Sequence, residues 1–254
     1  MNHMELLNTL LPIASAAGQA IMEVYERPPE AVYKDDGSPL TVADEAAEAI
    51  ILAGLKQIQP DITIISEENA ASHALGAPDR FFLVDPLDGT KEFLKRDGKG
   101  AFTVNIALVE HGVPVLGVVF APALNRMFAG TLADGAMEIN GDERRAIAIR
   151  PVAASGAVAV ASVSHRDQET DSWLSDRGIT DTVFTGSSLK FCLVAAGEAD
   201  VYPRFGPTME WDTGAGDSVL RAAGGRVTNP DGTPFSYGKP DYRNGGFVAW
   251  GSFQ

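Results

Sequence analysis

Asp85-Pro86-Leu87-Asp88-Gly89-Thr90 is the segment that indicates both the architecture and the chemistry of this chain. It follows Phe81-Phe82-Leu83-Val84, an entirely apolar run that predicts a buried strand. Asp85 is then expected where the strand leaves the core, and Pro86 restricts the residue before it to an extended conformation. Because Asp88 follows three residues later, we expect two carboxylates to converge on one small volume.

Two close carboxylates repel each other unless a cation lies between them. Oxygen ligands without His or Cys favour Mg²⁺ or Mn²⁺ over Zn²⁺, and Mg²⁺ also binds waters and substrate phosphate oxygens. Gly89 allows close backbone approach, and a helix that begins there would direct free amides at an anion. The alternative is a tight turn at Asp88-Gly89 with Asp85 as a cap. The complete segment favours the metal site.

Further acidic residues follow other predicted elements. A predicted strand over residues 61–65 ends at Ser66-Glu67-Glu68. Asp212 begins an Ala/Gly-rich helix, where its alternative role is an N-cap. Thr41 and Asp44 have the spacing of a capping box, which places Asp44 in the first turn of a second helix. Three more segments can therefore supply carboxylates to the same site.

The hexapeptide resembles the metal-binding signature of the inositol monophosphatase superfamily of lithium-sensitive, Mg²⁺-dependent phosphatases. Residues 209–216, with Trp211-Asp212, are similar to the superfamily's second signature. The resemblance covers residues 6–250 and is strongest to the bacterial CysQ branch, the 3′(2′),5′-bisphosphate nucleotidases. The segments that carry it are 85–93, 102–108, 186–192 and 202–208. It implies a layered αβαβα sandwich, α+β in its first half and α/β in its second.

The resemblance also implies a metal site with two or three Mg²⁺ ions, with Mn²⁺ as an alternative. Glu67, Asp85 and the Leu87 carbonyl would hold one ion. Asp85, Asp88 and Asp212 would hold a second, and a third, weaker ion would lie near Glu67. In such sites one ion activates a water and another stabilises the leaving oxygen, so no covalent intermediate is needed.

The remaining catalytic roles also follow from the resemblance. Thr90 and Asp44 would orient and deprotonate the attacking water, with Glu67 as the third catalytic residue. The amides of Gly89 and Thr90 would hold the scissile phosphate. Asp44 has an alternative role as an acidic residue that complements the helix dipole.

The substrate implied by the branch is adenosine 3′,5′-bisphosphate, which carries a second phosphate. Lys190 and Arg204 are candidates to bind it, although both can also be surface charges. Gly186-Ser187-Ser188 either faces the ligand or caps a helix. Where the branch often has Ser-Arg-Ser-His, this chain has Ser162-Val163-Ser164-His165, followed by Arg166. The expected substrate contacts are Glu67, Leu87, Asp88, Gly89, Thr90, Gly186, Ser187, Lys190, Arg204 and Asp212.

Hydrophobic periodicity predicts the other elements. We expect helices at 4–26, after residue 41, and at 168–176, 188–196 and 212–223. The expected strands are 102–109, 115–120, 126–131, 136–139, 146–149, 157–162, 182–184, 199–202, 226–228 and 246–249. Those between 102 and 149 form an antiparallel meander, and a boundary near residue 150 separates units 1–150 and 151–254. Residues 69–79, with a solvated His73, and 91–101, a candidate lid, are expected to be loops.

Composition excludes several classes of partner. The 254 residues are 45% hydrophobic and carry a formal net charge of −14, which disfavours binding to polymeric nucleic acid or an anionic membrane surface. No signal peptide or membrane-spanning run is apparent. The single cysteine, Cys192, cannot form an intrachain disulfide, which is consistent with the reducing cytoplasm. We expect it to be a small, buried, hydrophobic side chain. The resemblance allows peripheral association with the inner membrane, and both a monomer and a homodimer remain open.

These observations favour a Mg²⁺-dependent phosphatase that releases the 3′-phosphate of adenosine 3′,5′-bisphosphate, a by-product of sulfate assimilation, to give AMP. One alternative is an inositol-1-phosphate or broad-specificity sugar phosphatase. An alternative of another class is a catalytically silent, metal-binding regulatory protein.

Overall fold

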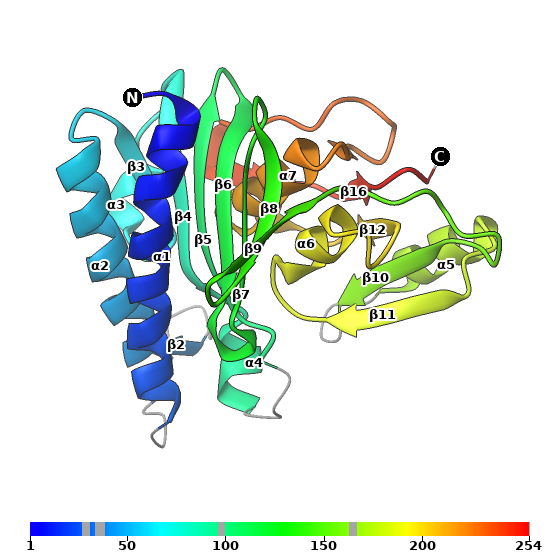
Figure 1. Cartoon of the computed structure of the whole chain (residues 1–254), viewed down its shortest axis with the longest axis horizontal. Coiled ribbons are helices and arrows are strands. Elements are labelled where there is room, and N and C mark those ends of the chain that lie inside the picture. Colours follow the sequence, from blue (N-terminus) through cyan, green and yellow to red (C-terminus); the bar gives the residue numbers. More distant parts are fainter. Residues whose placement is uncertain (27–30, 34–38, 96–99, 163–166, 254) are drawn as a thin grey trace.

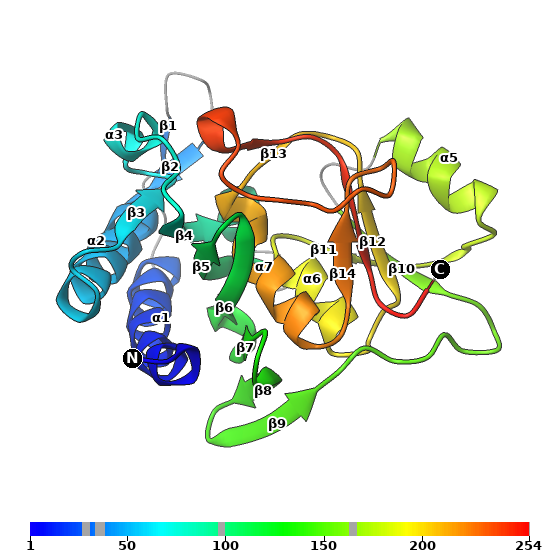
Figure 2. The ribbon, with the colours of Figure 1, turned by 90° about the horizontal axis from the view of Figure 1, so that it is seen from above.

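The computed structural model describes residues 1–26, 31–33, 39–95, 100–162 and 167–253, which form five layers. Helices α1 (His3–Tyr25) and α2 (Val42–Ile58) cover one face of a seven-stranded sheet (Figures 1 and 2). Helices α6 (Leu189–Ala195) and α7 (Trp211–Ala222) lie between this sheet and a five-stranded sheet. Helix α5 (Gln168–Asp176) covers the outer face of the smaller sheet. The predicted αβαβα sandwich is confirmed.

The larger sheet has its strands in the order of the sequence. They are β3 (Thr63–Ser66), β4 (Arg80–Asp88), β5 (Thr103–Glu110), β6 (Val113–Ala121), β7 (Arg126–Thr131), β8 (Gly135–Asn140) and β9 (Glu143–Ile147). In this sheet β3 and β4 are parallel, and every other neighbouring pair is antiparallel. The antiparallel meander predicted between residues 102 and 149 is therefore confirmed. The β5–β6 hairpin turns at His111-Gly112, both with positive φ, as its tight turn requires. Strand β9 begins three residues earlier than predicted.

The smaller sheet is mixed, with the order β11-β10-β12-β16-β14. Its strands are β10 (Val158–Ser162), β11 (Asp181–Thr185), β12 (Val201–Arg204), β14 (Arg226–Thr228) and β16 (Phe247–Trp250). β10 is parallel to both β11 and β12, whereas β16 is antiparallel to its two neighbours. Two short pairs complete the strands: β1 (Ala31–Tyr33) with β2 (Pro39–Thr41), and β13 (Thr208–Met209) with β15 (Arg243–Asn244). Single 3₁₀ turns are η1 (Pro122–Leu124) and η2 (Pro240–Tyr242).

Both predicted loops contain short helices, so these predictions are partly wrong. Helix α3 (Ala70–His73) lies in the first, and α4 (Thr90–Lys95) begins the candidate lid, of which residues 96–99 lie outside the described part of the chain. Helix α4 is too short to be stable by itself. It is held because Phe93 is fully buried in edge contact with the Phe102 ring.

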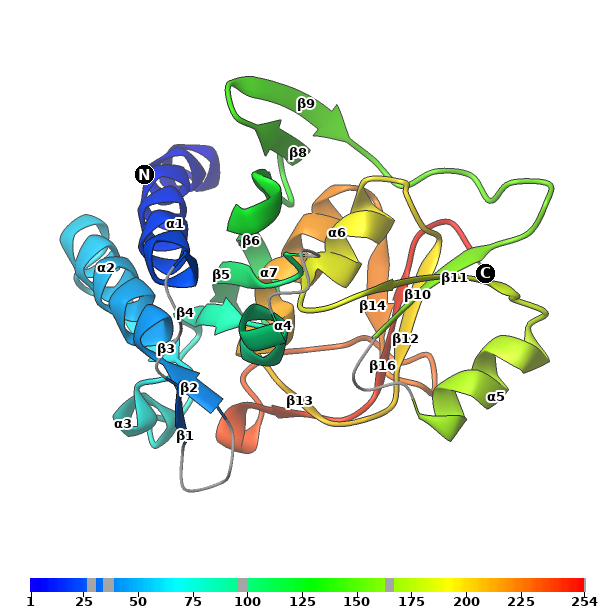
Figure 3. The same ribbon diagram turned by 90° about the horizontal axis from the view of Figure 1, so that it is seen from below.

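The two halves share a core. Helix α7 belongs to the second half, yet it packs on β5 and β6 of the first (Figure 3). The proposed boundary at residue 150 falls in the connection between β9 and β10 and remains a proposal. Within the part of the chain that the structure describes, none of the helices combines the length and the apolar character that a membrane crossing needs.

Gly117 sets how closely α7 approaches the sheet. A Cβ atom at this position of β6 would lie 2.5 Å from the Ala215 carbonyl oxygen and 2.9 Å from Ser218 Cβ. We expect Gly117→Ala to lower the free energy of unfolding by about 1–3 kcal/mol, because neither helix nor strand can move without disturbing the core. Urea unfolding measures this. Gly76→Ala, where a Cβ meets nothing within 4 Å, is the control, and an equal loss in both variants would contradict the packing argument.

Candidate active site

A bulge at the end of β4 brings Asp85 and Asp88 to one side of the strand. Asp85 pairs with Asn105 and Asp88 with Thr103, so three steps along β4 match two along β5. In a regular strand, side chains three residues apart face opposite sides, and the extra residue of a bulge corrects this. The expectation that the strand leaves the core at Asp85 is therefore wrong, since the strand stays buried through Leu87 and its pairing continues to Asp88. Both carboxylates line one pocket.

Three of the predicted ligands meet in space. Glu67 directly follows β3, and its amide donates to the Val84 carbonyl at 3.1 Å, which holds the end of β3 beside β4. One oxygen each of Glu67, Asp85 and Asp212 lies within 4.8 Å of the other two. Asp88 lines the same pocket outside this trio, as does Leu87.

Asp212 does not cap its helix, which corrects that alternative. The N-cap residue of α7 is Glu210, and Asp212 is the second residue inside the helix. Its Oδ2 accepts a hydrogen bond from the Met209 amide at 2.8 Å. The carboxylate is thus fixed by the backbone that precedes the helix, and that bond uses one of its two oxygens.

The site concentrates negative charge in a buried volume. The pKa of the Asp85 carboxyl is raised well above its usual range, chiefly by burial and also by the charges of Glu67 and Asp88. Burial, Asp88 and Glu67 likewise raise the pKa of Asp212. Among the described residues, Asp85 Oδ2 has no hydrogen-bond partner. A hard divalent cation would relieve the repulsion and bind this oxygen, so the residues fit Mg²⁺ or Mn²⁺.

Gly89 and Thr90 line the same pocket as the acidic residues. Gly89 has φ +90°, and a Cβ atom there would lie 2.9 Å from the Ala101 carbonyl oxygen, so the position requires glycine. Helix α4 begins at Thr90, whose hydroxyl donates to the Leu87 carbonyl at 3.2 Å. Asp44 lies buried in the first turn of α2 and contributes to the raised pKa of Asp85. Its pairing with Thr90 remains a prediction.

A buried polar network that the sequence reasoning missed holds Asp88. The Ser188 amide donates to Asp88 Oδ2, and Ser188 Oγ bonds Asn105 Oδ1 and lies 3.0 Å from Thr103 Oγ1. Ser188 occupies the N-cap position of α6, yet its side chain makes no cap bond. The capping alternative is therefore wrong for Ser188. The only sign of this polar network in the sequence was the similarity of segments 102–108 and 186–192 to the bisphosphate nucleotidase branch.

Two basic side chains, Lys190 and Arg204, line the same pocket. Lys190 is 3% exposed and donates to the Ser187 carbonyl, so its interpretation as a surface charge is wrong. Burial lowers the pKa of Lys190 to about 8, although the nearby Asp88 charge opposes this shift. Arg204 donates to the Pro207 carbonyl at 3.3 Å, while its Nε has no acceptor within the described residues. An anionic ligand group would supply that acceptor.

The pocket measures about 320 Å³. Every residue predicted to contact the substrate lines it, together with Asp85, whereas Asp44 is not among the lining residues. A Cβ atom at Gly186 would lie 2.7 Å from the Ala101 carbonyl oxygen, so glycine is needed for this close approach. Residues 163–166, where Arg166 was considered, lie outside the described residues.

Two predictions outside the pocket also have clear outcomes. His73 is not merely solvated: its ring stacks on Trp211 with centroids 4.6 Å apart, and its Nε2 lies 2.7 Å from the Ser66 carbonyl oxygen. His73 therefore contacts Ser66 and Trp211, the residues that directly precede Glu67 and Asp212 in the sequence. Cys192 is buried, as predicted, and burial raises the pKa of its thiol.

Comparisons with known proteins identify the family and the fold. Residues 2–250 match the model of the inositol monophosphatase family. The 3′(2′),5′-bisphosphate nucleotidase CysQ of Escherichia coli K12 is 45% identical over 246 residues, which cover 95% of this chain and 98% of that protein. CysQ of Salmonella typhimurium is 46% identical with the same coverage. The crystal structure of Bacteroides thetaiotaomicron CysQ is 38% identical, with a TM-score of 0.85 and 98% of each chain covered.

Proposed function

The chain belongs to the inositol monophosphatase family, and from this premise we propose that it is a Mg²⁺-dependent 3′(2′),5′-bisphosphate nucleotidase. It hydrolyses adenosine 3′,5′-bisphosphate to AMP and phosphate. Relatives that cover nearly its whole length carry the name of this activity. The observation that carries the proposal is a single pocket lined both by the Glu67–Asp85–Asp212 trio and by a buried lysine and a partly buried arginine.

The acidic residues would hold the metal ions. Glu67, Asp85 and the Leu87 carbonyl would bind one ion, and Asp85, Asp88 and Asp212 a second. Bound ions would supply a more acidic water and stabilise charge on the leaving oxygen. Asp85 Oδ2 has no hydrogen-bond partner in the part of the chain that the structure describes, which supports this assignment, because a buried carboxylate oxygen is unfavourable without a cation or donor.

Thr90 and Asp44 would orient the attacking water and accept its proton. The amides of Gly89 and Thr90 would hold the scissile phosphate beside them. Attack on phosphorus breaks the bond to the 3′-oxygen, which leaves with a proton to give AMP, while the water oxygen remains in the released phosphate. The position of Thr90 next to the Leu87 carbonyl supports its role near a bound water.

Lys190 and Arg204 would bind the second phosphate. Their charges lie in the same pocket as the acidic trio, and Arg204 Nε has no acceptor among the described residues. A nucleoside bisphosphate offers one phosphate to the metal site and a second to these basic side chains. An inositol monophosphate offers only one in total, so Lys190 and Arg204 would have no second phosphate to bind.

We expect kcat/KM with Mg²⁺ to be about 100-fold higher for adenosine 3′,5′-bisphosphate than for inositol 1-phosphate, the equivalent of one or two charge-assisted hydrogen bonds. Released phosphate measures both rates. Arg204→Met should reduce the preference about tenfold without changing the rate on inositol 1-phosphate, and Arg144→Met, at an exposed position, is the control.

The other results have distinct meanings. A preference for inositol 1-phosphate would retain the metal mechanism and reject the nucleotide. Turnover of neither compound would favour the silent metal-binding protein. The cytoplasmic location and the choice between monomer and homodimer remain predictions from the sequence.

A further inference from the structure

We propose that the buried ion pair between Glu210 and Lys239 positions Asp212 in the metal site, so that both are positioning residues for the reaction. The inference rests on the proposed function, because it concerns the metal affinity of Asp212. Neither residue lines the pocket. Their influence would pass through the first turn of α7.

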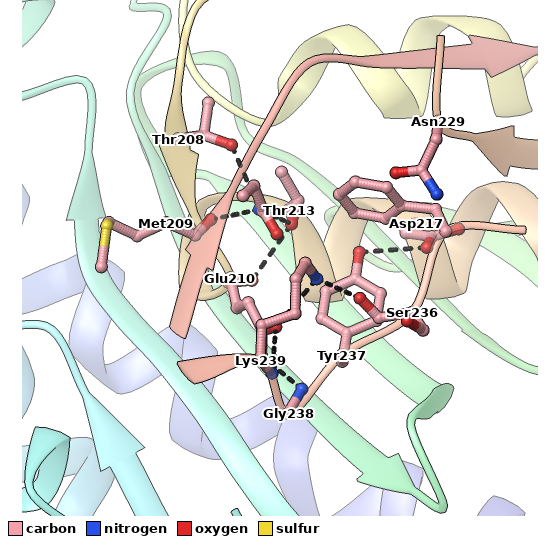
Figure 4. Close-up of polar contacts among 12 residues, drawn as sticks. Thr208, Met209, Glu210, Thr213, Asp217, Asn229, Ser236, Tyr237, Gly238 and Lys239 are labelled. Atoms are coloured by element: carbon pink, nitrogen blue, oxygen red, sulfur yellow. Dashed lines mark hydrogen bonds and ion pairs between the residues drawn. The ribbon is translucent and has the colours of Figure 1, made fainter. Parts of the chain in front are cut away.

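The Glu210 carboxylate is fully enclosed and points into the segment 236–239 (Figure 4). Its Oε2 accepts from the Gly238 amide at 2.7 Å. Its Oε1 accepts from the Lys239 amide at 3.0 Å and from Lys239 Nζ at 2.9 Å. Three donors from one short segment therefore hold this single carboxylate.

Lys239 is held as firmly as its partner. Besides Glu210, its ammonium donates to the Ser236 carbonyl. It lies 4.6 Å from the centroid of the Phe235 ring and 5.1 Å from that of Tyr237. Such contacts restrict the position of the side chain. Figure 4 shows Lys239 between Glu210 and Ser236.

The backbone of Glu210 transmits this restraint to Asp212. The Glu210 amide donates to the Tyr242 carbonyl at 2.8 Å, and its carbonyl accepts from the Gly214 amide at 2.9 Å, within the first turn of α7. Asp212 lies between these points, and its own carboxylate is bonded to Met209. A shift of Glu210 would therefore move the whole turn that carries Asp212.

The segment that holds Glu210 is itself attached to the first half of the chain. The Tyr242 hydroxyl donates to the Leu75 carbonyl at 2.8 Å, and the Tyr237 amide donates to the Gly112 carbonyl at 3.0 Å. Glu67 and Asp85 also belong to the first half. The Glu210 bonds thus fix Asp212 relative to the two other members of the trio.

A purely structural role is the competing explanation, and the chain offers a matched ion pair to test it. Arg150 and Asp200 form an ion pair at 2.9 Å, with an enclosed carboxylate and a cation that is 35% exposed, against 27% for Lys239. Asp200 also accepts a backbone amide bond, from Val158. Among the described residues, neither member of this pair lines the pocket or forms a side-chain hydrogen bond to α7.

The test compares Lys239→Met with Arg150→Met in the full-length protein. Each change leaves a buried carboxylate without its cation, so both variants should unfold at lower temperature. Mg²⁺ is then titrated into metal-free protein while the unfolding temperature is recorded, and the half-saturating Mg²⁺ concentration for turnover is measured separately. We expect Lys239→Met to raise both Mg²⁺ midpoints about tenfold, the usual effect of losing a residue that orients a metal ligand. Arg150→Met should leave both midpoints unchanged.

Lys239→Arg should recover most of the Mg²⁺ affinity, because it restores the cation. Unchanged Mg²⁺ midpoints in Lys239→Met would overturn this inference alone and leave the pair a structural role. Equal shifts in Lys239→Met and Arg150→Met would overturn it too, since any loss of stability would then weaken binding. If Mg²⁺ failed to raise the unfolding temperature of the unmodified protein, the proposed metal site itself would be wrong.

Discussion

Replacement of Asp88 by asparagine is expected to lower kcat about 1000-fold, which corresponds to about 4 kcal/mol of lost transition-state stabilisation. Asparagine keeps the size of the side chain and its Oδ1 can still accept the Ser188 amide. It removes the negative charge that we assign to the second metal ion. Single-turnover phosphate release at saturating Mg²⁺ measures the effect.

The stability of this variant separates loss of chemistry from loss of folding. In the metal-free protein the charge of Asp88 raises the pKa of both Asp85 and Asp212. A raised carboxyl pKa in the native state destabilises that state as pH rises, and this penalty declines as pH falls from the raised pKa values to the ordinary carboxyl pKa of the unfolded chain. Metal-free Asp88→Asn should therefore unfold at an equal or higher temperature near neutral pH. Normal turnover in this variant would reject the second metal position.

Thr90→Ala should reduce kcat about 100-fold and change KM little, since a group that orients the attacking water acts mainly in the transition state. The Thr90 hydroxyl is placed by its bond to the Leu87 carbonyl, and alanine removes only that hydroxyl. Steady-state kinetics on adenosine 3′,5′-bisphosphate provides both parameters.

Thr90→Ser is the matched control, because it keeps the hydroxyl and loses the methyl group. It should retain kcat within about tenfold of the unmodified enzyme. A rise in KM with unchanged kcat in Thr90→Ala would instead assign Thr90 to substrate binding. A similar loss of kcat in both variants would point to the methyl group and its packing.

The predictions that succeeded rest on local physical signals. The apolar run before Asp85 predicted β4, and the β-branched segment before Glu67 predicted β3. The meander followed from regular spacing of turn residues such as His111-Gly112. Periods of two and of 3.6 residues depend on neighbouring side chains, so the elements could be found without knowing their partners.

Details of the site that depend on distant contacts were missed or wrong. The network around Ser188 joins residues 83 or more positions apart, and His73 meets Trp211 across most of the chain. The burial of Lys190 also depends on the packing of α6. The sequence around Lys190 therefore could not distinguish a buried lysine from an exposed one. No local pattern encodes such contacts.

By itself the sequence determined the types of element, their order and the acidic residues that stand at their ends, because each depends on a few adjacent residues. Only the tertiary structure decided where those residues meet. The bulge that turns Asp88 toward Asp85 exists through pairing of β4 with β5. The approach of Asp212 depends on α7 packing against the sheet of the first half. Both arise from burial and hydrogen bonding between segments far apart along the chain, whose free energy is gained only when the layers assemble.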